Sequence, residues 1–152
     1  MSTLFATLHH AAVLTLFVCT LVSIYQLRQP LTLRGARLLR QTDMLNGITA
    51  TLVLLVGLVR VFYLEKGSTY YFGNGPFIAK LGVYGLASML SLVPTLAVRR
   101  WRSPLQQGQL PTVSDQKLTA MRTVAYLKLV CLVAMAICAN WAAHGGVLRS
   151  AH

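Results

Sequence analysis

The chain has 152 residues, of which 55% are apolar and only 11% are charged, with 14 Lys and Arg residues against three acidic ones for a formal net charge of +11. A soluble domain carries about 25% charged residues and disorder requires low hydrophobicity, so both classes are excluded. A nucleic-acid-binding protein is disfavoured, because the basic residues punctuate long apolar runs instead of forming a stripe on a polar surface. The composition predicts an integral membrane protein with a single domain over residues 1–152, embedded in a lipid bilayer.

Four apolar segments predict an all-α fold, an integral membrane four-helix bundle with helices over about residues 4–27, 44–64, 77–98 and 122–143. The first segment has no Lys, Arg, Asp or Glu and precedes the first basic residue, Arg28, whereas a cleaved signal peptide has basic residues before its apolar run. The second segment carries one charge, Arg60, and the third has Lys80 near its start. Ser114 and Asp115 are typical of a helix start, so the fourth helix is expected to begin in water.

The distribution of Lys and Arg predicts the orientation of these helices. Nine basic residues lie in the two segments that join the first helix to the second and the third to the fourth: Arg28, Arg34, Arg37, Arg40, Arg99, Arg100, Arg102, Lys117 and Arg122. The opposite side has only Lys66 and Arg149. Because basic loops stay in the cytoplasm, we expect both termini outside, in the periplasm of a bacterial inner (plasma) membrane. Asp43, at the inner boundary, is expected to cap the second helix, and Lys128 is expected to anchor the fourth at the interface.

Polar side chains inside the spans gather at the predicted outer side. Such groups are costly in a bilayer and usually face the bundle interior, where they mark function. They are, in chain order, His9, His10, Arg60, Lys80, Asn140 and His144. Alternate helices run in opposite directions, so all six are expected at one depth. His9 and His10 are adjacent and point about 100° apart, so at most one of them faces a given site.

The third helix carries a polar stripe at helical period: Lys80, Tyr84, Ser88, Ser91 and Thr95. This stripe is expected to face the other helices. A purely structural interpretation is also open, in which the stripe holds helices together and Lys80 snorkels to the interface. Tyr63 fits an interfacial aromatic belt equally well. The three cysteines, at positions 19, 131 and 138, form no CxxC pair and are expected to pack as small apolar residues.

These residue types point to a cofactor. Neutral imidazole is a ligand for haem iron and other metals, and Arg and Lys bind carboxylates, such as haem propionates, or polarise a quinone carbonyl. We therefore predict a b-type haem or a quinone near the outer side, with His9 as the axial metal ligand and His10 as its substitute. The predicted cofactor-binding residues are His9, His10, Arg60, Tyr63, Lys80, Tyr84 and His144.

The sequence resembles a bacterial family of four-helix inner-membrane proteins of unknown function. The resemblance covers roughly residues 1–145 and is carried by Leu8-His9-His10, by the run from Gly57 to Gly67, by Tyr70-Tyr71 and by the run from Pro76 to Leu81. More remotely, the chain is similar to the HemJ-type protoporphyrinogen oxidases, which have a histidine early in the first helix and a lysine early in the third. His9 and Lys80 match those positions, and Tyr70-Tyr71 departs from the pattern. This resemblance implies a haem- or quinone-linked membrane protein, since the HemJ-type proteins bind b-type haem and act as membrane oxidoreductases.

Two other functions stay open at this point. The chain fits a non-catalytic accessory or structural subunit of a larger membrane complex, or a homo-oligomer, in which the polar residues hold helices together and glycine-rich faces meet partner helices. A small transporter subunit is the least favoured interpretation, because four helices without inverted repeats form no pathway alone. No nucleic-acid partner is expected.

Overall fold

All regular structure in the described part of the chain is helical. The computed structural model describes residues 2–64 and 75–143. The elements are α1 (Ser2–Arg28), α2 (Leu33–Val59), the π-helical turn η1 (Arg60–Leu64), α4 (Gly75–Arg99), α5 (Arg102–Gln106) and α6 (Asp115–Ala143). Within these ranges, α1, α2 with η1, α4 and α6 are long and apolar enough to cross a membrane. The predicted all-α fold with four membrane-spanning helices is confirmed.

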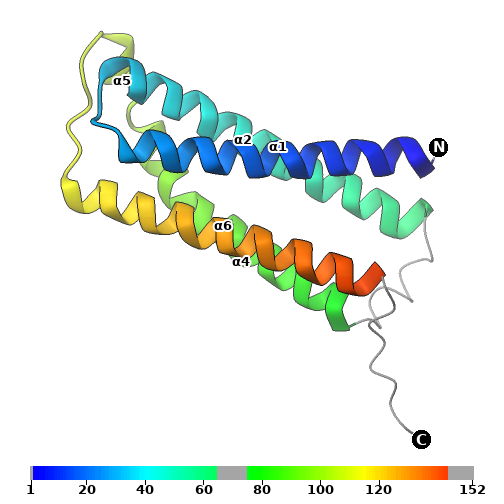
Figure 1. The fold of residues 1–152 in the computed structure, drawn as a ribbon. Coiled ribbons are helices and arrows are strands. Elements are labelled where there is room, and N and C mark those ends of the chain that lie inside the picture. Colours follow the sequence, from blue (N-terminus) through cyan, green and yellow to red (C-terminus); the bar gives the residue numbers. More distant parts are fainter. Residues whose placement is uncertain (1, 65–74, 144–152) are drawn as a thin grey trace, which may run out of the picture.

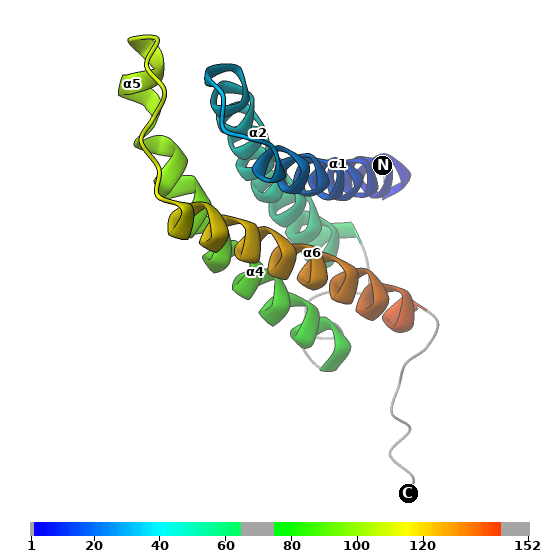
Figure 2. The same cartoon turned by 60° about the vertical axis from the view of Figure 1, so that its left-hand side comes forward.

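The long helices form two antiparallel pairs, α1 with α2 and α4 with α6 (Figure 1). Figure 2 shows α4 and α6 running side by side, and the two pairs meet mainly through α1 and α6. The start of α1 and the end of α6 lie at one end of the bundle, termed the His9 end, whereas the 29–32 turn and α5 lie at the opposite end, termed the basic end (Figure 1). The segments that carry the nine clustered Lys and Arg residues therefore lie at or near the basic end.

The second helix begins eleven residues earlier than its predicted span over residues 44–64, at Leu33. Thr32 is its N-cap, and the Thr32 side chain accepts a hydrogen bond from the backbone N–H of Gly35 at 3.0 Å. The predicted cap, Asp43, is wrong, because this residue lies three turns inside α2. The hydropathy pattern marks only the part of a helix that the bilayer covers, so the basic first turns of α2 were missed. The fourth helix does start at Asp115, as its cap residues predict.

Two buried apolar clusters fill the bundle. The cluster nearer the basic end consists of Ile24, Leu27, Ala36, Leu39, Val98, Trp101, Leu105, Met121 and Ala125. The cluster nearer the His9 end consists of Ala12, Leu16, Val53, Leu132 and Met135, with Phe17 and Tyr84 packed against it. Along α1, α2 and α6 the buried polar residues lie between these two clusters. We use the term polar layer for the set of Thr20, Asp43, Asn46, Thr49, Thr95 and Lys128.

Large apolar side chains cover the outside of the bundle. Leu14, Met89 and Val130 are 64–70% exposed, and such residues recur on all four long helices. A soluble protein rarely exposes apolar surface on this scale. In a bilayer the same surface contacts lipid tails, which agrees with a multi-pass membrane protein.

Candidate functional site

His9 is seated on α2 at the His9 end of the bundle. A Cβ atom placed on Gly57 would lie 3.3 Å from Cε1 and 3.7 Å from Nδ1 of the His9 ring. The ring therefore occupies the space that any larger residue at position 57 would fill. The Nδ1 atom of His9 is buried. Gly57 thus allows a close approach between the imidazole and the α2 backbone, and this approach fixes His9 toward the bundle rather than toward lipid.

His10 points elsewhere. Its side chain is exposed, and its Nδ1 atom lies 2.6 Å from the carbonyl oxygen of Ala6, one turn earlier on the same helix. The rings of His9 and His10 meet edge to face, with centroids 6.1 Å apart and an interplanar angle of 84°. The prediction that at most one of the two histidines faces a given site agrees with this geometry. His9 is the inward residue of the pair.

Arg60 opens the π-helical turn η1, which packs against α1. The backbone N–H of Arg60 donates to the carbonyl oxygens of Gly57 and Val56. η1 directly follows α2, and π-helical turns are rare and frequently mark functional sites. Arg60 is half-buried and follows Gly57 by three residues, so it lies within one turn of the place where His9 is seated. Sequence patterns predicted Arg60 as a candidate but contained no signal for the π-helical turn.

The other predicted cofactor-binding residues do not share one environment. Lys80 is half-buried in the second turn of α4, whose first turn is at the His9 end. The Tyr84 hydroxyl donates to the carbonyl oxygen of Ala50 on α2, at 2.5 Å, so it holds α4 and α2 together. Tyr63 is 83% exposed, which fits the aromatic belt better than a contact inside the bundle. His144 lies outside the described residues.

The polar stripe on α4 faces the bundle only in part. Tyr84 and Thr95 both bond residues of α2. The hydroxyls of Ser88 and Ser91 instead donate to carbonyl oxygens one turn earlier on α4, those of Tyr84 and Ala87. The stripe was expected to contact neighbouring helices along its whole length. Serine hydroxyls, however, can donate a hydrogen bond to a carbonyl oxygen of their own helix when no partner on another helix is within reach.

The polar layer contains residues whose pairing the sequence did not predict. Lys128 is only 9% exposed, and it interacts electrostatically with the Asp43 carboxylate across the bundle. Thr95 donates its hydroxyl to Oδ1 of Asp43 at 3.0 Å. The prediction of Lys128 as an interfacial anchor is therefore wrong, because its side chain is buried inside the bundle. Asp43 thus joins α2 to α4 through a hydrogen bond and interacts with α6 through the charge of Lys128.

Asn46, one turn from Asp43 on α2, is 7% exposed, and its Oδ1 atom is buried without a hydrogen-bond partner. An orphaned buried carbonyl of this kind costs free energy unless a water molecule satisfies it. Asn46 and Thr49 continue the inward face of α2, as their spacing indicates. The three-residue step from Asp43 to Asn46 puts both side chains on one face of α2, and this is the sequence signal that could have indicated the layer.

Metal chemistry by protein ligands alone is not supported in the described residues. No group of three or more His, Cys, Asp or Glu side chains is placed to hold a metal ion within residues 2–64 and 75–143. Cys19 is buried, and Cys131 and Cys138 are half-buried and free, which agrees with packing. A haem differs from a bare ion in this respect, because its porphyrin supplies four of the iron ligands and the protein needs to add only one imidazole.

Comparison with known proteins places the whole described bundle in one family. The family model described as "Predicted membrane protein (DUF2214)" matches residues 1–146. No match is found among curated proteins or among solved structures.

Proposed function

We propose that this chain, which belongs to the DUF2214 family of predicted membrane proteins, binds a b-type haem at the His9 end of its bundle and acts in electron transfer or oxidation within the membrane. A quinone is the alternative ligand for the same residues. The observation that carries the proposal is the seating of His9 on Gly57, while the neighbouring His10 is turned onto its own helix.

The residues at this end fit a haem. A single inward imidazole is the protein ligand that a five-coordinate haem iron requires. We assign ligation to Nε2 of His9, because Nδ1 is buried. When bound, the haem supplies the one-electron redox chemistry, and the protein orients it and sets the surrounding charge.

Arg60 and Lys80 would hold the carboxylates of the haem. Both are half-buried cations at the His9 end, on α2 and α4 respectively, so they approach from the two different helix pairs. Charge-assisted hydrogen bonds to carboxylates are stronger than neutral ones, and Arg can make two in parallel. For a quinone, the same two cations would polarise a carbonyl oxygen.

The two adjacent histidines provide a matched test. The purified full chain, expressed with ample haem, is examined by visible absorption as isolated and after dithionite reduction. We expect a Soret band with sharp α and β bands on reduction. His9→Ala should abolish these bands, whereas His10→Ala should retain them, since both variants lose the same side chain from the same turn.

Two outcomes would overturn the haem assignment. One is equal haem content in His9→Ala and His10→Ala. The other is a featureless wild-type spectrum. In the second case, organic extraction of the purified protein shows whether a quinone is bound, and a quinone lost in Arg60→Gln but retained in His10→Ala would identify it as the ligand.

A second candidate function, that of a subunit in a larger membrane complex, is favoured by the outer face of α4. Only 11% of the residues in its most apolar 18-residue stretch are buried, against 22–28% in the other three helices. Gly82 and Gly85 lie on this helix with nothing within 4 Å of a Cβ built on either, and glycines let a second helix approach closely. Cysteine crosslinking from Gly82→Cys in native membranes tests it: a specific crosslinked product is expected, and an uncrosslinked monomer would exclude a partner at this face.

A further inference from the structure

Two adjoining cavities flank the 29–32 turn at the basic end. The smaller has a volume of about 240 Å³ and lies between the end of α1 and the start of α2. The larger, of about 810 Å³, lies between the turn, the linker over residues 110–114 and the start of α6. Both cavities are lined by Gln29, Pro30, Leu31 and Leu118. They are therefore two compartments of one surface depression.

The charges that line this depression are mostly positive. Lys117 and Arg122 line the larger compartment and Arg34 lines the smaller, while Asp115 is the acidic residue among the lining side chains. Arg34 and Lys117 are exposed. Arg122 is half-buried and held in place, because its Nε donates to the carbonyl oxygen of Leu27 at 2.6 Å. An anion in the larger compartment therefore lies near Arg122, whose side chain is held by this hydrogen bond, and near Lys117, whose side chain is exposed.

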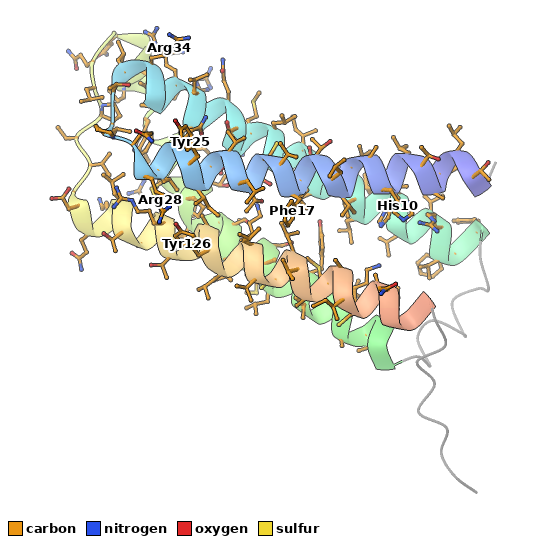
Figure 3. The ribbon with its side chains drawn as sticks, in the orientation of Figure 1. His10, Phe17, Tyr25, Arg28, Arg34 and Tyr126 are labelled. Carbon is orange, nitrogen blue, oxygen red and sulfur yellow. The ribbon has the colours of Figure 1, made fainter. Side chains whose placement is uncertain are left out.

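The depression also has an apolar wall. Leu27, Leu38 and Leu39 line the smaller compartment beside Tyr25, whose ring is 65% exposed. The spanning part of α1 ends at Arg28, where the guanidinium carbon lies 5.9 Å from the centre of the Tyr126 ring (Figure 3). Exposed tyrosines and arginines at the end of a span mark the headgroup level of a bilayer. A ligand at this level with one anionic part and one apolar part matches both the basic lining residues and the apolar wall.

We propose that this depression is a binding site for one anionic phospholipid. The phosphate lies at Lys117 and Arg122, with Arg34 adding to the field from the smaller compartment, and the first part of an acyl chain lies along the leucines. Basic pockets between spanning helices are a recognised way to hold anionic headgroups. The site is at the opposite end of the bundle from His9, so it does not depend on haem or quinone binding.

Native mass spectrometry of the purified full chain in neutral detergent tests the site. The protein is titrated with a short-chain phosphatidylglycerol and, separately, with the phosphatidylcholine of the same chains. We expect the anionic lipid to bind more tightly. Arg34→Gln and Lys117→Gln should each weaken its binding about fivefold, the amount expected for one cation near a charged headgroup. Asp115→Asn should strengthen it, because the substitution removes the acidic lining residue.

The matched control is the double variant Arg100→Gln/Arg102→Gln, which removes two exposed cations from the same end but outside both compartments. It should leave the affinity within about twofold of wild type, whereas Arg34→Gln/Lys117→Gln should lower it about 25-fold. Circular dichroism confirms that all variants keep their helix content. The proposal is overturned if the two double variants weaken binding equally or if both lipids bind equally. It is also overturned if inorganic phosphate displaces the lipid at a similar concentration, because the site would then bind free anions.

Discussion

The substitution Lys128→Met tests whether the polar layer holds the two helix pairs together. Methionine has nearly the same length as lysine without its charge, so the variant removes the ammonium group but opens little space. The Asp43 carboxylate then loses the charge of Lys128 but keeps that of Arg99 and the hydrogen bond from Thr95 at 3.0 Å. The companion variant Asp43→Asn leaves the Lys128 ammonium, which is only 9% exposed, without its carboxylate.

The expected losses follow from the burial of each partner. Removal of one member of a buried ion pair in direct contact costs about 3–5 kcal/mol of unfolding free energy. Lys128 and Asp43 interact electrostatically without a direct ion-pair contact, so each single variant should cost less, about 2 kcal/mol. The double variant carries neither charge and should cost about 3 kcal/mol, which corresponds to a coupling energy of about 1 kcal/mol.

The assay is reversible unfolding of the purified chain in mixed micelles with increasing SDS. Circular dichroism reports the helices, and fluorescence reports the two tryptophans, of which Trp101 is 5% exposed in the cluster at the basic end. Lys117→Met is the matched control, since it is the same substitution on the same helix at an exposed position; it should change the free energy by about 0.5 kcal/mol or less. If the losses of the two single variants simply add in the double variant, Lys128 and Asp43 are not coupled and the reasoning fails.

Two further predictions concern the His9 end. Gly57→Ala places a Cβ 3.3 Å from the His9 ring, so the ring must shift. We expect haem affinity to fall about fivefold, as for a modest overpacking cost, with the helix content unchanged. A wild-type ratio of Soret to protein absorbance would contradict this. Tyr84→Phe removes the hydrogen bond to Ala50. It should lower the free energy of unfolding by about 0.6–1.7 kcal/mol in the same SDS assay, while the haem content stays as in wild type. A loss of haem without a loss of stability would instead place the hydroxyl at the cofactor.

The number of spanning helices was predictable because the bilayer sets a minimum length of apolar sequence that composition alone reveals. The true helix ends were not predictable in the same way. The first turns of α2, with Arg34 and Arg37, carry too much charge for a hydropathy window, although the cap at Thr32 is a readable signal in retrospect. The charged residues do gather at one end of the bundle (Figure 1), but their pattern did not mark where α2 begins.

The inward faces of the helices were harder to predict than their number. A helix with apolar residues all round gives no periodic signal for the side that faces its neighbours, and the most apolar stretches of α1, α2 and α6 are of this kind. Sequence spacing did place His9, Arg60 and Lys80 at a common end. It did not place Lys128 near Asp43, because their interaction depends on how α2 meets α6, and the two residues lie far apart in the chain.

The polar layer also bears on how the His9 end is assembled. Lipid tails are as apolar as leucine, so hydrophobic burial gives spanning helices little preference for one register over another. Two hydrogen bonds supply that preference here, Tyr84 to Ala50 and Thr95 to Asp43, and the charge of Lys128 acts on the same carboxylate. All three interactions link the α1–α2 pair to the α4–α6 pair. His9 and Arg60 belong to the first pair and Lys80 to the second, so these contacts fix the depth of Lys80 relative to the imidazole. Lys128→Met should therefore lower haem affinity even in its folded fraction, whereas a purely local role for the layer would leave that affinity unchanged.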